Sequence, residues 1–164
     1  MIEKTKINTE ILDEAIRFAT EAHKDFLRKG TTTPYVLHPL EAAAIVATMT
    51  DDIEVIAAAV LHDTVEDNKS ISIEEIENKF GKRIKDLVAA ESEKKEEDEV
   101  GSWEKRKQAT IDYLRDEATE EEKIIALGDK LSNIRAIYKD YITTGDKLWG
   151  RFNQTDKHMH GWYY

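Results

Sequence analysis

The sequence predicts an all-α fold, and three observations support that prediction. Apolar residues recur at helical spacing in nearly every segment, and only two prolines interrupt the 164 residues. No stretch of useful length alternates apolar and polar residues as a half-buried strand would. We find no internal repeat. A chain of this length is expected to form a single domain, residues 1–164, around one core.

The first half of the chain contains three predicted helices. A proline-bearing loop at residues 30–34 separates the first, at about residues 9–28, from the second, which opens at His38-Pro39 because proline is favoured in a first turn. Asp51-Asp52 is the expected N-cap of the third helix, which carries His62-Asp63. The apolar positions that predict the first helix are Ile11, Leu12, Ala15, Ile16, Ala19, Ala22 and Phe26.

The second half also reads as helical. Residues 72–75, Ser-Ile-Glu-Glu, form a capping box, and Gly81 can end the short helix that the box begins. A charged loop follows the next helix, and a second capping box at residues 119–122 starts the last and longest one. These remaining helices are predicted over residues 82–92, 102–117 and 119–141.

Cysteine is absent from the sequence, which excludes disulfides and thiolate metal sites. Any metal must therefore be held by histidine and carboxylate groups. No apolar run reaches the roughly 20 residues that span a bilayer. The N-terminal segment also lacks the apolar core of a signal peptide. We therefore predict a cytoplasmic protein with no membrane partner.

The net charge of −10 argues against binding nucleic acid, because neutralising phosphates requires a basic surface. Much of this acidity lies in residues 91–99 and 117–122, which are expected to be solvated. A small phosphorylated ligand remains compatible, provided that a metal and a few cations offset the negative field. Whether the chain forms a homo-oligomer is left open.

His62-Asp63 is the most informative pair in the chain. It follows the apolar helical residues 56–61, and a buried carboxylate is costly unless it has a partner. A divalent cation can bond both imidazole nitrogen and carboxylate oxygen. Glu66 and Asp67 lie four residues further on, so all four side chains are predicted to share one stretch of helix surface.

His38 and Asp129 are further candidate ligands. The proline after His38 fixes its backbone, and Asp129 lies in an apolar segment. Gly128 lowers helix stability, so it predicts close packing against a neighbouring element. Asn133, one turn after Asp129, can face the same cavity. Taken singly, such a histidine more often caps or packs, and such an aspartate more often pairs with arginine.

Together these residues resemble the H…HD…D pattern of the HD-domain metal-dependent phosphohydrolases, which are helical bundles. The resemblance narrows to the (p)ppGpp hydrolase domain of the RelA/SpoT family, whose HDxxED motif is similar to residues 57–67. Residues 22–43 and 127–137 are similar to that domain's opening and third motif. Residues 102–114 and 148–153 are similar to the stand-alone small alarmone hydrolases.

The resemblance implies a metal site and a catalytic acidic pair. One manganese ion (Mn2+) per chain is the implied cofactor. Glu66 and Asp67 match the acidic pair that activates water and handles the proton of the leaving group. The implied metal ligands are His38, His62, Asp63 and Asp129.

The resemblance also implies how a small-molecule nucleotide would bind. Arg28 and Lys29 match the basic pair that meets phosphates and nucleotide, and Asn133 matches an asparagine near the ribose. An aromatic residue near the C-terminus approaches the nucleotide in this family, which makes Tyr163 a candidate. From the residues alone, Arg28-Lys29 would be taken for a solvated helix end.

The implied activity is a (p)ppGpp 3′-pyrophosphohydrolase, which releases pyrophosphate from the 3′ position and leaves GDP or GTP. Two alternatives stay open at this point. The same site could serve an NADPH 2′-phosphatase or another nucleotide phosphohydrolase. The chain could instead be a non-catalytic nucleotide-binding module, although such a module has no need of Glu66 and Asp67 beside a full set of ligands.

Five further residues receive structural interpretations. His23 is expected to support the metal ligands from behind or to pack, rather than to bind metal itself. Lys130 and Arg135 are expected to form ion pairs with the many carboxylates. His158 and His160 resemble a metal pair, but a solvent-facing position near the C-terminus is the prediction.

Overall fold

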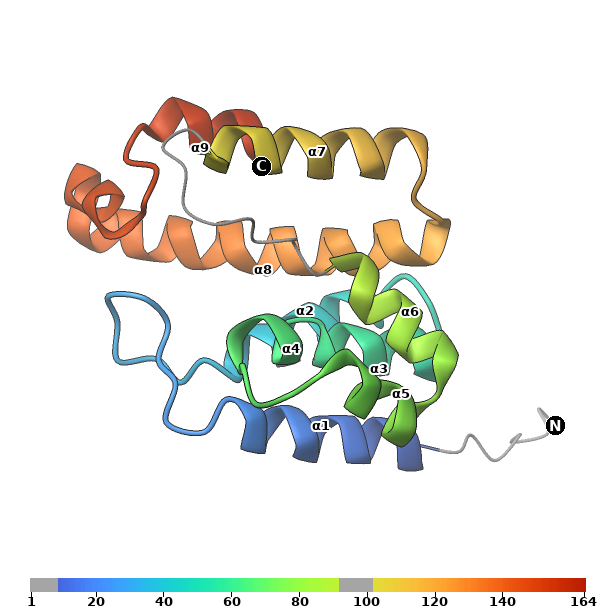
Figure 1. Cartoon of the computed structure of the whole chain (residues 1–164). Helices are drawn as coiled ribbons and strands as arrows, with labels where there is room; N and C mark the ends of the chain where they lie inside the picture. The colour runs from blue at the N-terminus through green and yellow to red at the C-terminus, as the bar shows by residue number, and fades with distance from the viewer. Residues whose placement is uncertain (1–8, 92–101) are drawn as a thin grey trace, which may run out of the picture.

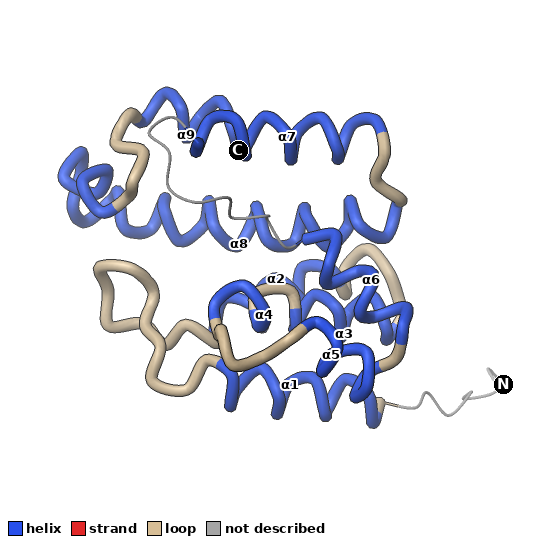
Figure 2. The backbone as a smooth tube through the Cα atoms, in the orientation of Figure 1, coloured by secondary structure: helices blue, strands red, loops and turns tan. Residues whose placement is uncertain are grey.

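A computed structural model describes residues 9–91 and 102–164, and helices are the only regular elements within them (Figure 2). The all-α prediction is confirmed. No helix among the described residues is long and apolar enough to cross a bilayer. The helices are α1 (Glu10–Ala22), α2 (Leu37–Val46), α3 (Ile53–Leu61), α4 (Thr64–Asp67), α5 (Ile73–Phe80), α6 (Lys82–Glu91), α7 (Ser102–Asp116), α8 (Glu120–Thr144), the 3₁₀ helix η1 (Gly145–Arg151) and α9 (Lys157–Tyr163).

Helix α3 lies at the centre of the fold. Its residues Val55–Leu61 are all 8% exposed or less, and the helix contacts α1, α2, α6 and α8. In Figure 1, α1 runs along one side of this group, α8 crosses the other side, and α7 and α9 lie beyond α8. The three consecutive alanines of α3 let its neighbours approach closely, because they add little side-chain volume. The residues that follow α3 are therefore held by the most buried element of the fold.

Local capping predictions are confirmed at three helices. The Asp52 carboxylate accepts a hydrogen bond from the Glu54 N–H at 3.0 Å, at the start of α3. The Thr119 capping box is complete at the start of α8. Gly81 ends α5 with φ of 87°, in the left-handed region that favours glycine.

The prediction that the first helix extends to residue 28 is wrong, because α1 ends at Ala22. Asp25 adopts φ of 64°, which no continuing α-helix allows. The chain then forms a loop closed by an antiparallel bridge between Leu27 and Pro34. Phe26 continues the helical spacing of apolar residues although it lies outside the helix. For this reason the spacing predicted a helix that is too long.

The helix predicted to carry His62-Asp63 and Glu66-Asp67 is interrupted. His62 is the C-cap of α3, and Asp63 is the N-cap of the short helix α4. The Thr64 hydroxyl donates a hydrogen bond to the Leu61 carbonyl at 2.7 Å across this junction. The four side chains therefore do not lie along one continuous helix surface. The prediction that they would is wrong.

Gly128 packs closely, as predicted. A Cβ atom built there would lie 2.7 Å from Val46 Cγ2 and 2.8 Å from the Ala42 carbonyl oxygen. Helices α2 and α8 thus approach each other at a point that only glycine allows, directly beside Asp129.

Candidate functional site

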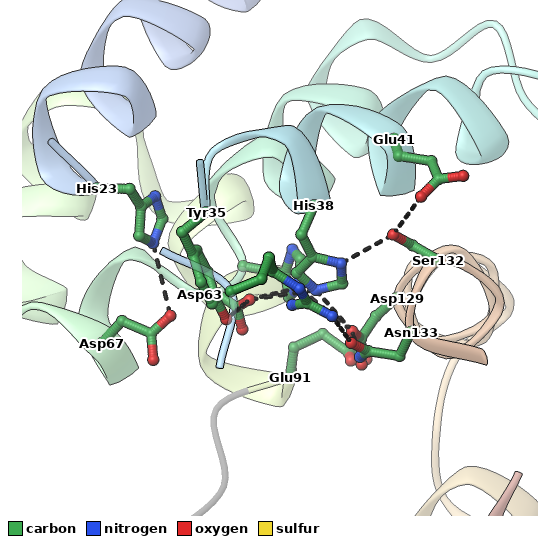
Figure 3. A network of polar contacts seen from close by, with 12 residues as sticks. His23, Tyr35, His38, Glu41, Asp63, Asp67, Glu91, Asp129, Ser132 and Asn133 are labelled. Atoms are coloured by element: carbon green, nitrogen blue, oxygen red, sulfur yellow. Dashed lines mark hydrogen bonds and ion pairs between the residues drawn. The ribbon is translucent and has the colours of Figure 1, made fainter. Parts of the chain in front are cut away.

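Three separate elements bring the four predicted metal ligands together. His38 comes from α2, His62 and Asp63 from the junction of α3 and α4, and Asp129 from α8. Figure 3 shows His38, Asp63 and Asp129 gathered at one point. His38 Nε2 lies 3.1 Å from Asp129 Oδ1 and 3.3 Å from Asp63 Oδ2. His62 Nε2 lies 3.2 Å from Asp63 Oδ2 and 3.6 Å from Asp129 Oδ1. Two imidazoles therefore face two carboxylates.

This arrangement fits a divalent cation. Donor atoms of His38, His62 and Asp129 all lie within 4.8 Å of one another. His62 Nε2 is buried without a hydrogen-bond partner, whereas His62 Nδ1 lies 2.7 Å from the Ala59 carbonyl oxygen. A buried polar atom without a partner needs an explanation, and a bound cation supplies one. Two imidazole and two carboxylate donors suit Mn2+, Fe2+ or Zn2+.

The electrostatics keep both carboxylates ionised. Burial is the largest single effect and opposes ionisation of Asp63, but the charge of His62 and the hydrogen bonds of His38 and His62 together outweigh it and hold the pKa of Asp63 well below its usual range. At Asp129 burial is likewise outweighed, chiefly by the charge of Lys130, so the pKa of Asp129 is also lowered. Ionised carboxylates are the form that binds metal.

Tyr35 also belongs to the site, although no pattern in the sequence had indicated it. Its hydroxyl donates a hydrogen bond to Asp63 Oδ2 at 2.8 Å. Burial first, and then the charges of Asp63 and Asp67, raise the pKa of Tyr35 above its usual value. Tyr35 therefore remains a neutral donor that fixes the Asp63 carboxylate.

Glu66 and Asp67 occupy different surroundings. Glu66 lines a cavity of about 140 Å³ together with the four candidate ligands. Asp67 does not line that cavity, and its Oδ2 lies 3.6 Å from His23 Nε2 (Figure 3). His23 is 3% exposed, in accord with the packing role predicted for it. The structure therefore brings Glu66, but not Asp67, into the wall of the metal cavity.

Glu91 is a second residue that the sequence reasoning missed. It was assigned to the solvated acidic run, but its side chain is 7% exposed and lines the same cavity. Burial raises its pKa to about 7. Glu91 follows the buried Leu87 by four residues, so helical spacing could have placed it on the buried face. Residues 92–99 of the run lie outside the described residues.

A larger cavity of about 510 Å³ adjoins the metal cavity, and Tyr35, His38, Asn133 and Tyr164 line both. Cations outnumber anions in its wall although the whole chain carries a net charge of −10. Its charged lining residues are Arg28, Lys29, Arg135, Lys139 and Arg151, against Glu41 and Asp140. A cation-rich hollow in an acidic protein suits an anionic ligand.

Asn133 connects the two cavities. Its Nδ2 donates to Asp129 Oδ1 at 2.6 Å, and its Oδ1 accepts from Arg28 at 2.6 Å. The Arg28 guanidinium also lies 5.3 Å from the ring centroid of Tyr35. Lys29 Nζ is 3.3 Å from Asn153 Oδ1 at the rim. Asn133 and Arg28 therefore lie next to the candidate ligand Asp129, whereas Lys29 lies in the wall of the larger cavity.

Tyr163 lies in the wall of the metal cavity, between two lysines. Lys107 Nζ is 4.6 Å and Lys130 Nζ 5.8 Å from its ring centroid. Lys130 also pairs with Asp129 at 2.7 Å, which confirms the predicted ion pair. Tyr164, which the sequence did not single out, lines both cavities.

The remaining predictions have mixed outcomes. Arg135 forms its predicted ion pair, with Glu41 at 3.5 Å. His158 is exposed as predicted, but the same prediction is wrong for His160, which is 6% exposed. His160 Nε2 lies 2.7 Å from the Gln154 carbonyl oxygen, and its ring packs against aromatic neighbours. His160 therefore contributes to the packing of α9 against its neighbours.

The sequence of this chain is similar to those of known proteins. Residues 15–148 match the HD domain family. A zebrafish protein named guanosine-3′,5′-bis(diphosphate) 3′-pyrophosphohydrolase MESH1 is 33% identical over 131 residues, covering 78% of this chain and 69% of that protein. The Aquifex aeolicus guanosine-3′,5′-bis(diphosphate) 3′-pyrophosphohydrolase is 33% identical over 135 residues, covering 80% of this chain.

Several relatives are much longer than this chain. The matched region spans 18% of the Aquifex aeolicus protein and 15% of a chloroplastic relative from rice. Among solved structures, one described as a metazoan ortholog of SpoT that hydrolyzes ppGpp superposes with a TM-score of 0.72 at 26% identity. That match covers 93% of this chain and 91% of the other, so the described helices share one arrangement with it.

Proposed function

The chain belongs to the HD-domain family, and on that premise we propose that it is a metal-dependent (p)ppGpp 3′-pyrophosphohydrolase. It releases pyrophosphate from the 3′ position and leaves GDP or GTP. One observation carries the proposal: the cavity lined by the four candidate ligands adjoins a cation-rich cavity of about 510 Å³. The activity printed for the zebrafish and Aquifex aeolicus relatives supports it.

We propose Mn2+ as the cofactor, one ion per chain. His38, His62, Asp63 and Asp129 would hold it, because their donor atoms already converge. When bound, such a cation lowers the pKa of water and neutralises charge that develops on phosphorus.

The protein's own groups would position the reactants. Glu66 lines the metal cavity and is the proposed base that orients and deprotonates the attacking water. Tyr35 keeps the Asp63 carboxylate in place through its hydrogen bond. The catalytic role of Asp67 stays a prediction, since its carboxylate is turned toward His23.

Phosphate recognition is assigned to two basic residues in the wall of the larger cavity. Arg28 offers a planar fork of donors and Lys29 a point charge, a combination that suits a diphosphate. Asn133 lies between Arg28 and Asp129, where the ribose that links the 3′-diphosphate to the base would pass. Tyr163 offers its ring at the other wall of the metal cavity. The base would then occupy the larger cavity.

Incubating the purified protein with ppGpp and Mn2+, and with NADPH in parallel, tests the proposal. We expect pyrophosphate release from ppGpp, and no turnover by D63A. D116A is the matched control, because Asp116 is exposed and pairs only with surface groups. Metal-bound wild-type protein that releases no pyrophosphate would contradict the proposal, and faster phosphate release from NADPH would reassign the substrate. The single-domain extent, the cytoplasmic location and the oligomeric state stay predictions.

A further inference from the structure

His38 faces the candidate metal site with Nε2 and, with Nδ1, a side-chain relay that runs from the buried Ser132 to Glu41, whose side chain is 41% exposed. His38 Nδ1 lies 2.8 Å from Ser132 Oγ, and the Ser132 hydroxyl donates to Glu41 Oε2 at 2.8 Å (Figure 3). His38 is 4% exposed and Ser132 is 1% exposed. Glu41 forms part of the wall of the larger cavity. The relay of His38, Ser132 and Glu41 therefore connects the candidate metal site to the larger cavity.

The chemistry of the three groups fixes the direction of the hydrogen bonds. An ionised carboxylate only accepts, so the Ser132 hydroxyl proton points to Glu41. The oxygen of Ser132 then accepts from His38, which places the imidazole proton on Nδ1. His38 Nε2 is left with its lone pair toward Asp63 and Asp129, as a metal ligand requires.

His62 provides a useful contrast. Its Nδ1 is held by the backbone carbonyl of Ala59 at 2.7 Å, a partner that no side-chain substitution removes. The orientation of His38 depends instead on two side chains from two helices, Glu41 on α2 and Ser132 on α8. Of the two histidines, His38 is therefore the one whose orientation a substitution of its hydrogen-bond partners can perturb.

We propose that Ser132 and Glu41 are positioning residues that fix the tautomer and ring orientation of His38 and thereby set the metal affinity. The inference rests on the proposed metal site, but not on the identity of the nucleotide. Outer partners of metal-bound histidines typically contribute about 10–100-fold in affinity. Glu41 also lies 3.5 Å from Arg135, so its charge is balanced at the cavity end of the relay.

Titrating Mn2+ into metal-stripped protein by isothermal titration calorimetry, without nucleotide, tests the relay. We expect S132A to raise the Kd for Mn2+ by about 10–100-fold. E41A should weaken binding as well, whereas E41Q keeps an acceptor for the serine hydroxyl and should stay within about threefold of wild type. S72A is the matched control, since the Ser72 hydroxyl caps α5 far from the site.

A second readout reports the tautomer itself. In Zn2+-loaded protein, nitrogen-edited NMR of the imidazole rings should show a protected Nδ1 proton on His38, and S132A should lose that protection. Wild-type Mn2+ affinity in S132A, or equal affinity in E41A and wild type, would overturn the proposal. The E41A and E41Q pair decides the matter if S132A does not fold. If the variants bind Mn2+ with the expected graded affinities but the wild-type protein does not hydrolyse ppGpp, the relay is supported and the proposed function is contradicted.

Discussion

Replacing Gly128 with alanine should separate α2 from α8 beside Asp129. The added methyl would lie 2.7 Å from Val46 Cγ2 and 2.8 Å from the Ala42 carbonyl oxygen. Carbon atoms in contact prefer about 3.5–4.0 Å, so the neighbours must move by about 1 Å. The Val46 side chain can rotate, but the Ala42 oxygen belongs to the backbone. The helices themselves must therefore shift.

The expected cost combines two opposing effects. Overpacking a tight interface costs about 1–3 kcal/mol, and a clash with backbone favours the upper half of that range. Alanine recovers about 1 kcal/mol of helix propensity relative to glycine. We therefore expect a net loss of about 1–2 kcal/mol in the free energy of unfolding. For a chain of this size that corresponds to a fall in Tm of about 2–8 °C.

Thermal and urea unfolding measure the stability change, and ppGpp hydrolysis measures its effect on the site. A displacement of about 1 Å beside a ligand can lower turnover by as much as about 100-fold. G161A is the matched control, because nothing lies within 4 Å of a Cβ at Gly161 in α9, and it should leave activity unchanged. A G128A protein as stable and active as wild type would refute the packing argument.

Four further outcomes are expected. Chelating the metal should lower the Tm, because a cation present at about 100 times its Kd stabilises the fold by about 2.7 kcal/mol, and differential scanning calorimetry should show the loss. Y35F should destabilise the protein by about 1.5–3 kcal/mol in urea unfolding, since it removes the donor to an ionised carboxylate; an unchanged midpoint would contradict this. R28A should raise the KM for ppGpp about tenfold in steady-state assays, with little change in kcat. D52A should cost about 1 kcal/mol at neutral pH as a lost N-cap. Because Arg83 lowers the pKa of Asp52 from 3.8, that contribution is present above pH 3.8, and the difference between wild type and variant should shrink as the pH falls further.

The sequence predicted the helix starts well because capping is local. Asp52 and Thr119 each bond to an amide two or three residues ahead, so the signal lies within one turn. The end of α1 was not predictable in this way. It depends on the turn at Asp25 and on the pairing of Leu27 with Pro34, which no window of helical periodicity registers.

The residues of the candidate site fall into the same two groups, those that a local pattern predicts and those that only the tertiary structure reveals. Spacing and family resemblance singled out residues that carry their chemistry in the sequence, such as His62 and Asp63. Ser132 became visible only through packing, because a serine on a helix has no distinctive meaning until its surroundings are known. Helical spacing could have assigned Glu91 to the buried face of its helix, but not to the cavity. Ser132 is placed beside His38 by the contact of α8 with α2. Glu91 reaches the cavity because the buried face of α6 carries it inward.

The alanine-rich centre of the fold has a consequence for how this protein can change. His62 and Asp63 follow a helix whose buried residues cannot be replaced by larger ones without overpacking the core. The positions of these two candidate ligands therefore tolerate little change in the helix before them. The loop closed by Leu27 and Pro34, together with η1, supplies Arg28, Lys29 and Arg151 to the larger cavity. Loops accept substitutions and insertions more readily than cores do. On the proposed function, substrate preference can therefore evolve, or be engineered, in one part of the chain while the proposed metal centre stays unchanged in another.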